Sequence, residues 1–149
     1  MQKRYKLGFD VWGLLLFLII MLPNFIWFAV PAPNDILRTD SNTKILDTVA
    51  SVCQVWMVIV LCIIQNHQCK KLRMTPLVGI TMICYLLYIV SWIAYYSGIV
   101  SSVVIWGLII PPCVAFMVFA IDRKNWPAII PISIFTVCHL VYGAVNFII

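Results

Sequence analysis

Long runs of apolar residues, separated by short clusters of charged and turn-forming residues, dominate this chain. About 20 apolar residues are enough to cross the hydrocarbon core of a bilayer as a helix. Divided at its charged and turn residues, the chain therefore predicts five transmembrane helices. The expected spans are roughly 9–30, 45–65, 75–97, 99–121 and 126–149.

The clearest case is the stretch between Arg73 and Asp122, which contains no charged residue. Its 48 residues are too many for one membrane helix and suit two. Ser97-Gly98 and Ser101-Ser102 offer the turn between them. We expect a tight helical hairpin here, and we expect residues 1–149 to form a single all-α, polytopic membrane domain.

Composition agrees with this fold class. The chain has 149 residues, of which 64% are hydrophobic and only 10% are charged, and its mean hydropathy is +1.05. A soluble domain would carry about 25% charged residues. The net charge of +5 is therefore not a sign of nucleic-acid binding, and little chain is left for a soluble catalytic domain.

The positions of Lys and Arg predict how the bundle is oriented, because cytoplasmic loops are enriched in both. Eight of them would lie on one side of the membrane and two on the other. The eight are Lys3, Arg4, Lys6, Lys70, Lys71, Arg73, Arg123 and Lys124. Arg38 and Lys44 lie on the other side, offset by Asp35 and Asp40. We expect the amino terminus in the cytoplasm and the carboxyl terminus outside.

Polar residues recur at helical spacing within three of the spans. They are Asp47, Ser51 and Gln54 in the second span, Tyr85, Tyr88, Trp92 and Tyr95 in the third, and His139, Tyr142 and Asn146 in the fifth. Positions i, i+3, i+4 and i+7 share one face of a helix. The polar or phenolic residues of each of these spans therefore lie on one face of its helix.

With the first, third and fifth spans running outward, most of these groups reach the outer half of the membrane. A cavity that opens to the outside is the simplest geometry giving them partners or water. The candidate ligand-binding residues are Asn24, Asp47, Gln54, Tyr88, Ser91, His139, Tyr142 and Asn146. The alternative is that the same groups form interhelical hydrogen bonds, each worth about 1 kcal/mol or less.

Asp47 and His139 are the ionisable members of this set. A proton-coupled pair is one interpretation, because a nearby carboxylate favours a charged histidine. We favour the other, in which Asp47 is a carboxylate in the first turn of its helix and His139 is a neutral hydrogen-bonding group. Prolines support a site: Pro23 and the pair Pro111-Pro112 are expected to break their helices and free backbone carbonyls.

Metal and cofactor sites are not expected. His67 and Cys69 are the nearest approach to a metal motif, and two ligands in a loop are too few for one. The six cysteines form no CxxC pair, so structural disulfides are not expected either.

Four short segments of this chain carry a resemblance to known sequences. They are Leu22–Phe28, Pro33–Asp35, Ala120–Asn125, and Tyr142-Gly143 with Asn146-Phe147. At these residues the chain resembles, over nearly its full length, a group of small multi-pass membrane proteins of Gram-positive bacteria that has no assigned function. The resemblance implies a location in the plasma membrane and supplies no activity.

Three function classes follow. We favour a protein that binds or transports a small molecule in the outward-facing cavity. An accessory subunit of a membrane complex is the alternative, and a homo-oligomer or a partner membrane subunit is compatible with every class. A membrane-embedded enzyme acting on lipid would need a catalytic constellation, and only His139 with Cys138, Tyr142 and Asp47 offers candidates, so we assign no catalytic residue.

Overall fold

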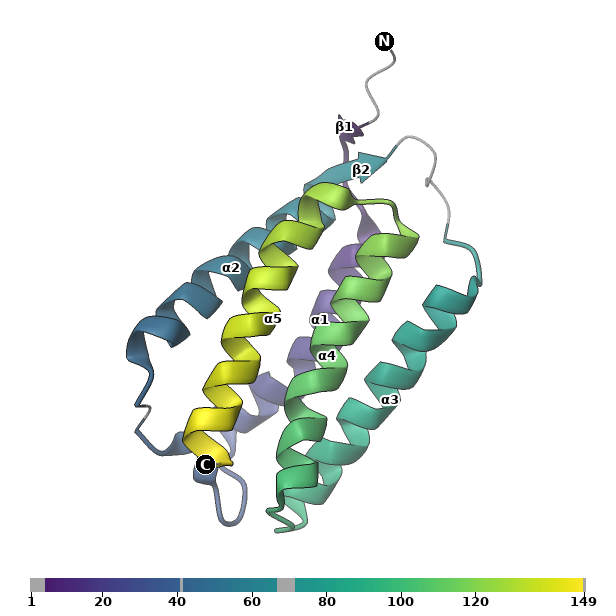
Figure 1. The fold of residues 1–149 in the computed structure, drawn as a ribbon. Helices are drawn as coiled ribbons and strands as arrows, with labels where there is room; N and C mark the ends of the chain where they lie inside the picture. Colours follow the sequence, from purple (N-terminus) through teal and green to yellow (C-terminus); the bar gives the residue numbers. More distant parts are fainter. Residues whose placement is uncertain (1–4, 41, 67–71, 149) are drawn as a thin grey trace.

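Five long helices make up almost the whole of the computed structural model, which describes residues 5–40, 42–66 and 72–148 (Figure 1). They are α1 (Val11–Ala29), α2 (Lys44–Ile63), α3 (Pro76–Tyr96), α4 (Ser102–Asp122) and α5 (Trp126–Phe147). Each is long and apolar enough to cross a membrane. The structure confirms the prediction of five apolar helices, with ends within a few residues of the expected spans.

The helix ends follow from local capping chemistry. The side chains of Asp10, Thr75 and Ser101 accept hydrogen bonds from backbone N–H groups in the first turns of α1, α3 and α4. Between α3 and α4, Gly98 has a φ of +82°, a conformation that glycine adopts without steric cost. The expected tight hairpin is therefore present.

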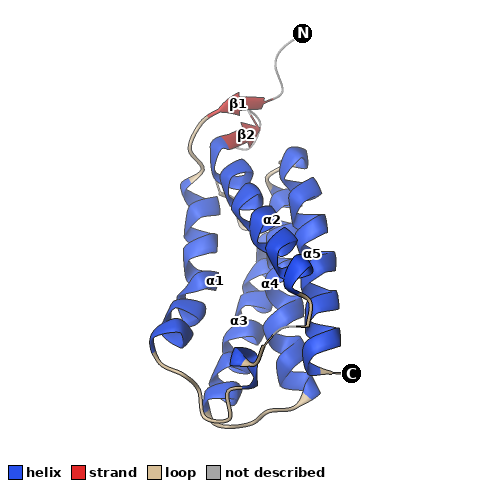
Figure 2. Cartoon of the chain, turned by 90° about the vertical axis from the view of Figure 1, so that its left-hand side faces the viewer, coloured by secondary structure: helices blue, strands red, loops and turns tan. Residues whose placement is uncertain are grey.

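The arrangement of the helices is uneven. α4 is the most buried of the five, and it packs along both α3 and α5, while α2 packs along α5. α1 makes far fewer contacts with the other helices and stands to one side of them (Figure 2). The molecule is a packed group of four helices with a fifth, α1, attached less extensively.

Small residues allow the helices to approach closely. A Cβ atom at Gly107 of α4 would collide with the hydroxyl of Ser91 on α3, and one at Gly143 of α5 would collide with Ile109 on α4. A Cβ at Gly13 of α1 would lie 3.2 Å from the carbonyl oxygen of Leu61 on α2. Such contacts are typical of helix packing in membranes.

The expected proline breaks are wrong. Pro23 lies inside a continuous α1, and Pro111 and Pro112 both lie inside a continuous α4. A proline removes one backbone hydrogen bond, but a membrane helix tolerates this where neighbouring helices and local adjustments satisfy the freed groups. All three prolines are buried within the bundle.

A small two-stranded sheet at one end of the bundle was not expected. β1 (Tyr5–Leu7) pairs antiparallel with β2 (Ile64–Asn66), which directly follows α2. Backbone hydrogen bonds from Gly8 to Ile63 and from Asp10 to Cys62 continue the pairing to the start of α1. The beginning of the chain is therefore bound to the end of α2.

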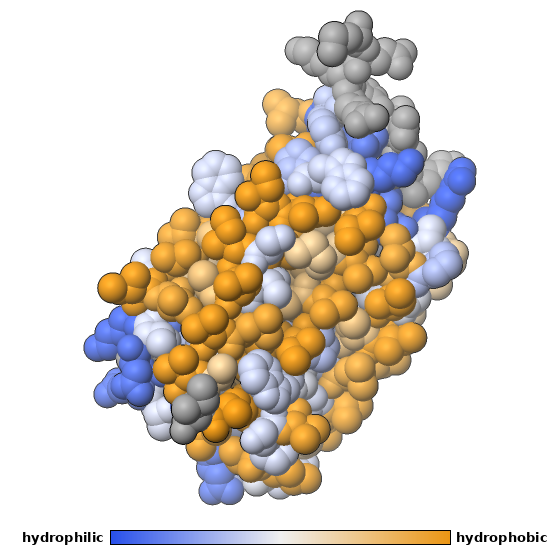
Figure 3. All heavy atoms as spheres, viewed as in Figure 1, coloured by the Kyte–Doolittle hydropathy of each residue, from blue (hydrophilic) through white to orange (hydrophobic). Residues whose placement is uncertain are grey.

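These features define two ends of the bundle. We call the end with β1, β2 and the α4–α5 turn the sheet end. The opposite end, with the α1–α2 loop, the α3–α4 turn and the carboxyl terminus, is the loop end (Figure 1). In the view of Figure 3, hydrophilic residues gather near these two ends and hydrophobic residues cover the surface between them, as a membrane-spanning protein requires.

Candidate functional site: a cavity in the loop-end half of the bundle

A cavity of about 250 Å³ lies between the helices, in the half of the bundle nearer the loop end. All five helices and one loop residue contribute to its wall. The lining residues are Ile20, Met21, Asn24, Trp27, Phe28, Leu37, Gln54, Tyr88, Trp92, Ile105, Leu108, Ile109, Pro112, Phe116, Phe135, His139, Tyr142 and Phe147. No charged side chain is among them.

Five of the candidate residues line this one cavity. They are Asn24, Gln54, Tyr88, His139 and Tyr142, and they come from α1, α2, α3 and α5. Helical periodicity predicted which residues share a face of each helix. The structure shows that these faces of α1, α2, α3 and α5 point into one cavity.

The other three candidates lie elsewhere. Ser91 packs against Gly107 at the α3–α4 contact, and its hydroxyl donates to the backbone oxygen of Leu87. The amide of Asn146 donates to the Thr43 hydroxyl at 2.8 Å and accepts the backbone N–H of Asn42. This amide therefore connects the end of α5 to the start of α2.

Asp47 belongs to the same connection between α2 and α5. Its carboxylate accepts a hydrogen bond from the Thr43 hydroxyl at 3.5 Å, and it lies in the first turn of α2. It is not among the residues that line the cavity. This placement agrees with the interpretation of Asp47 as a carboxylate at a helix start.

Asn24 and Tyr88 form a short hydrogen bond between two walls of the cavity. The Asn24 amide donates to the Tyr88 hydroxyl at 2.7 Å and also reaches the backbone oxygen of Ile20. The Tyr88 side chain is only 2% exposed. This hydrogen bond joins α1 to α3 and has the character of interhelical packing.

Other polar groups of the wall keep unused hydrogen-bonding capacity. His139 stacks between Phe135 and Tyr142, with ring centroids 5.0 and 6.2 Å away. Within residues 5–40, 42–66 and 72–148, neither its imidazole nitrogens nor the Tyr142 hydroxyl has a hydrogen-bond partner. The amide nitrogen of Gln54 contacts only the sulfur of Met21, at 3.4 Å, and a thioether is a weak acceptor.

Trp92 adds a buried donor without an acceptor. Its side chain is 5% exposed, and its indole Nε1 has no hydrogen-bond partner in the described part of the chain. The rings of Tyr88 and Tyr95 pack edge-on against the indole. A buried polar atom that lacks a partner costs roughly 1–3 kcal/mol, so the cavity wall contains several groups that a polar ligand would satisfy.

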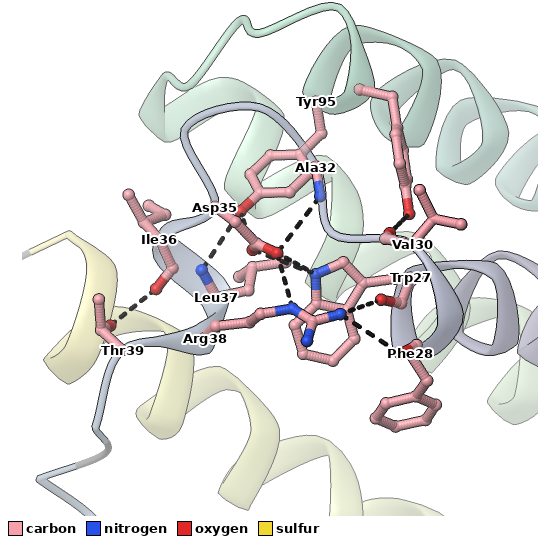
Figure 4. Close-up of polar contacts among 11 residues, drawn as sticks. Trp27, Phe28, Val30, Ala32, Asp35, Ile36, Leu37, Arg38, Thr39 and Tyr95 are labelled. Atoms are coloured by element: carbon pink, nitrogen blue, oxygen red, sulfur yellow. Dashed lines mark hydrogen bonds and ion pairs between the residues drawn. The ribbon is translucent and has the colours of Figure 1, made fainter.

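The loop between α1 and α2 contributes Leu37 to the cavity wall and is held by hydrogen bonds around Asp35 (Figure 4). The carboxylate of Asp35 accepts hydrogen bonds from Trp27 Nε1 at 2.9 Å, from the Tyr95 hydroxyl at 2.8 Å and from Arg38 Nε at 3.0 Å. The Tyr95 hydroxyl in turn accepts the backbone N–H of Leu37 at 3.2 Å. Asp35 therefore fixes Leu37, a lining residue, above the cavity, and we call this set the Asp35 network.

Electrostatics of the network follow from its hydrogen bonds. Partial burial would by itself raise the pKa of Asp35, but hydrogen bonds from Tyr95, Trp27, the backbone of Ala32 and Arg38 outweigh burial and hold that pKa below its ordinary value. The guanidinium of Arg38 also donates to the backbone oxygens of Trp27 and Phe28 and lies over the Trp27 ring.

At the sheet end, a buried ion pair joins the start of α1 to the end of α4. Nε of Arg123 lies 2.9 Å from the carboxylate of Asp10, and the two side chains are 5% and 6% exposed. The other Asp10 oxygen accepts the backbone N–H groups of Trp12 and Gly13 at the start of α1. The amide of Asn125 donates to the backbone oxygens of Val60 and Ile64 at the end of α2.

Sequence reasoning overlooked these two clusters. Arg123 was expected as a positive charge near the membrane surface, and Asp35 as a charge that offsets Arg38 within a turn, residues 31–35, that could cap the cavity. Neither was expected to form a buried ion pair or a hydrogen-bond network. The available signals were the positions of Asp10 and Asp35 beside apolar spans and the presence of Trp27 and Tyr95, which carry polar atoms that need partners when buried.

Metal binding finds no support in the described residues. They contain no group of three or more His, Cys, Asp or Glu side chains that could hold a metal ion. His67 and Cys69, considered above as a minimal metal motif, lie outside the described residues. The expected cytoplasmic residues Lys3, Arg4, Lys70 and Lys71 also lie outside them.

Comparisons with protein-family models, with curated proteins and with solved structures found no match to this chain.

Proposed function

We propose that this protein binds a small, uncharged molecule in the cavity, within the outer half of the plasma membrane of a Gram-positive bacterium. The observation that carries the proposal is the pairing of an apolar wall with polar groups that lack partners. In the described part of the chain the groups without a partner are His139, Tyr142 and the Trp92 indole, and the Gln54 amide has only the weak thioether acceptor of Met21. Ligand pockets generally combine an apolar lining with a few polar groups that fix orientation.

The size of the cavity supports a small ligand. An engineered cavity of about 150 Å³ in another protein binds benzene, and this cavity measures about 250 Å³. It therefore suits a molecule with a single ring and a polar substituent, or the polar part of a larger molecule. Binding and transport would use the same site.

Benzyl alcohol is a suitable probe, because it has one ring and one hydroxyl group. We expect it to raise the Tm of the purified protein and of His139→Gln, since glutamine keeps a donor and an acceptor. His139→Leu should lose the effect, because leucine offers neither. Equal Tm shifts in all three proteins would show that the alcohol acts through the detergent or the surface, and would contradict a cavity site.

We further propose that the sheet end faces the cytoplasm and the loop end faces outward. The excess of Lys and Arg on the predicted inner side supports this orientation. In a cysteine-free background, Asn42→Cys should react with a membrane-impermeant maleimide in intact cells, and Met74→Cys should react only after lysis. Both positions are exposed. Labelling of Met74→Cys in intact cells would reverse the orientation.

A further inference from the structure

A second hollow lies between α1 and α3, beside the cavity. Its volume is about 300 Å³, and its walls are Leu22, Pro23, Ile26, Ile89, Trp92, Ile93 and Tyr96. The Tyr96 hydroxyl is engaged by the backbone oxygen of Val30 at 2.7 Å. Apart from this hydroxyl and the indole nitrogen of Trp92, the walls offer only hydrocarbon. We call this hollow the α1–α3 groove.

Trp92 belongs to the walls of both the cavity and the groove. One side chain therefore lies between a space with polar groups and a space without them. Packing between α1 and α3 is sparse, and the Asn24–Tyr88 hydrogen bond joins them at this depth. Trp92 is therefore the side chain at the boundary between the two spaces.

The two ends of the cavity are formed by residues that are hydrogen-bonded or buried. Toward the loop end, Leu37 is held by Tyr95 and thereby by Asp35. Toward the sheet end, Leu16, Met57 and Leu61 belong to the buried core. If a ligand is larger than the cavity, the part that does not fit would therefore extend into the α1–α3 groove.

The charge of the lining restricts the part of the ligand that occupies the cavity. Lining residues include no Lys, Arg, Asp or Glu, and the nearby Arg38 guanidinium is engaged by Asp35 and by the backbone oxygens of Trp27 and Phe28. A charged group would enter this wall without a counter-charge, which is costly in an apolar environment. An uncharged hydroxyl or carbonyl group would instead find partners in His139 and the indole of Trp92.

We propose that the ligand is a single-chain lipid with a small, uncharged polar head, such as a monoacylglycerol. The head occupies the cavity, and the acyl chain leaves sideways through the α1–α3 groove into the bilayer. This inference rests on the proposed function, because it assigns a ligand class to the same cavity. Entry is therefore from the membrane, between α1 and α3, and not from water through the loop end.

The test uses the full-length protein in phosphatidylcholine nanodiscs and a monoacylglycerol with a diazirine in its acyl chain. After irradiation, we expect the label on α1 and α3 peptides that contain the groove residues. Ile93→Trp should reduce this labelling to the level of His139→Leu, because the indole fills the path of the chain. Val90→Trp is the matched control: both positions are 61% exposed on α3, and Val90 does not line the groove.

Benzyl alcohol separates the two proposals, since it fits the cavity without the groove. Ile93→Trp should keep the benzyl alcohol response while it loses lipid labelling. Equal lipid labelling in Ile93→Trp, Val90→Trp and wild type, with an intact alcohol response, would overturn the lipid proposal and leave the proposed function standing. If benzyl alcohol does not raise the Tm of the wild-type protein, both the proposed function and the lipid proposal are overturned.

Competition tests the head group. Unlabelled monoolein should displace the probe, and oleate at pH 9 should not, because its carboxylate would enter a cavity without a positive charge. Equal displacement by both lipids would contradict an uncharged head.

Discussion

Each end of the bundle has an aspartate paired with an arginine. The two pairs differ in how buried they are and in how far apart the partners lie in the sequence. Asp10 and Arg123 are almost fully buried and lie 113 residues apart in the sequence. Asp35 and Arg38 are three residues apart, and the Arg38 side chain is 42% exposed. Arg123 is a buried charge that depends on Asp10, whereas Asp35 collects several donors, of which Arg38 is one.

The two pairs have different roles in the fold. The pair at the sheet end joins the start of α1 to the end of α4, so it determines where α1 is attached. The Asp35 network orders a loop above the cavity. We therefore expect global destabilisation when the first is broken and a local effect above the cavity when the second is broken.

The largest expected effect is that of Arg123→Met. It leaves the Asp10 carboxylate buried without its counter-charge, and breaking a buried pair in this way costs about 3–5 kcal/mol. The free energy of unfolding of the purified protein in mixed micelles measures the change. Arg38→Met, the equivalent change in the exposed pair, should cost about 1 kcal/mol or less.

The double variant Asp10→Asn with Arg123→Met sharpens this comparison. Asparagine still caps the start of α1, and no buried charge remains, so most of the lost stability should return. If the double variant were as unstable as Arg123→Met alone, the cost would come from lost packing and not from the unpaired carboxylate.

Asp35→Asn should have an intermediate effect. It replaces hydrogen bonds to a charged acceptor with weaker ones, for an expected loss of about 2 kcal/mol at neutral pH. The same unfolding measurement applies. A loss as large as that of Arg123→Met would show that the two ends do not differ as we describe.

The pH dependence of stability gives the smallest effect and isolates Asp35. Because its pKa is lower in the folded state, its contribution is complete above the unfolded value of about 3.9 and is lost as pH falls through the folded pKa. We expect wild-type stability to decrease below about pH 4 and Asp35→Asn to lack that component. Identical pH profiles would exclude Asp35 as the source.

The sequence predicted the number and extent of the helices because hydrophobic length is almost sufficient to specify a membrane span. It also placed Gln54, Tyr88 and His139 in one cavity, since helical periodicity and depth are both readable from the chain. Ser91 and Asn146 are also polar, and both were predicted in the outer half of the membrane. Their neighbours decide their roles: Gly107 approaches Ser91, and Thr43 meets Asn146.

The contacts between distant segments could not be read from periodicity. The pairing of β1 with β2 joins three-residue strands that are too short to show alternation, and the Asp10–Arg123 pair depends on how α1 lies against α4. Pro111 and Pro112 led to a wrong prediction, because propensity rules for water-soluble helices overstate the effect of a proline in a buried membrane helix.

The attachment of α1 also has a consequence for biogenesis. Asp10 is made 113 residues before its partner Arg123, which follows only after α4 is complete. Until then α1 has the strand pairing of β1 with β2 and its contact with α2 to hold it. Of the five helices, α1 is made first but is therefore among the last to reach its final position, and chains that end before Arg123 should leave α1 more accessible to proteases.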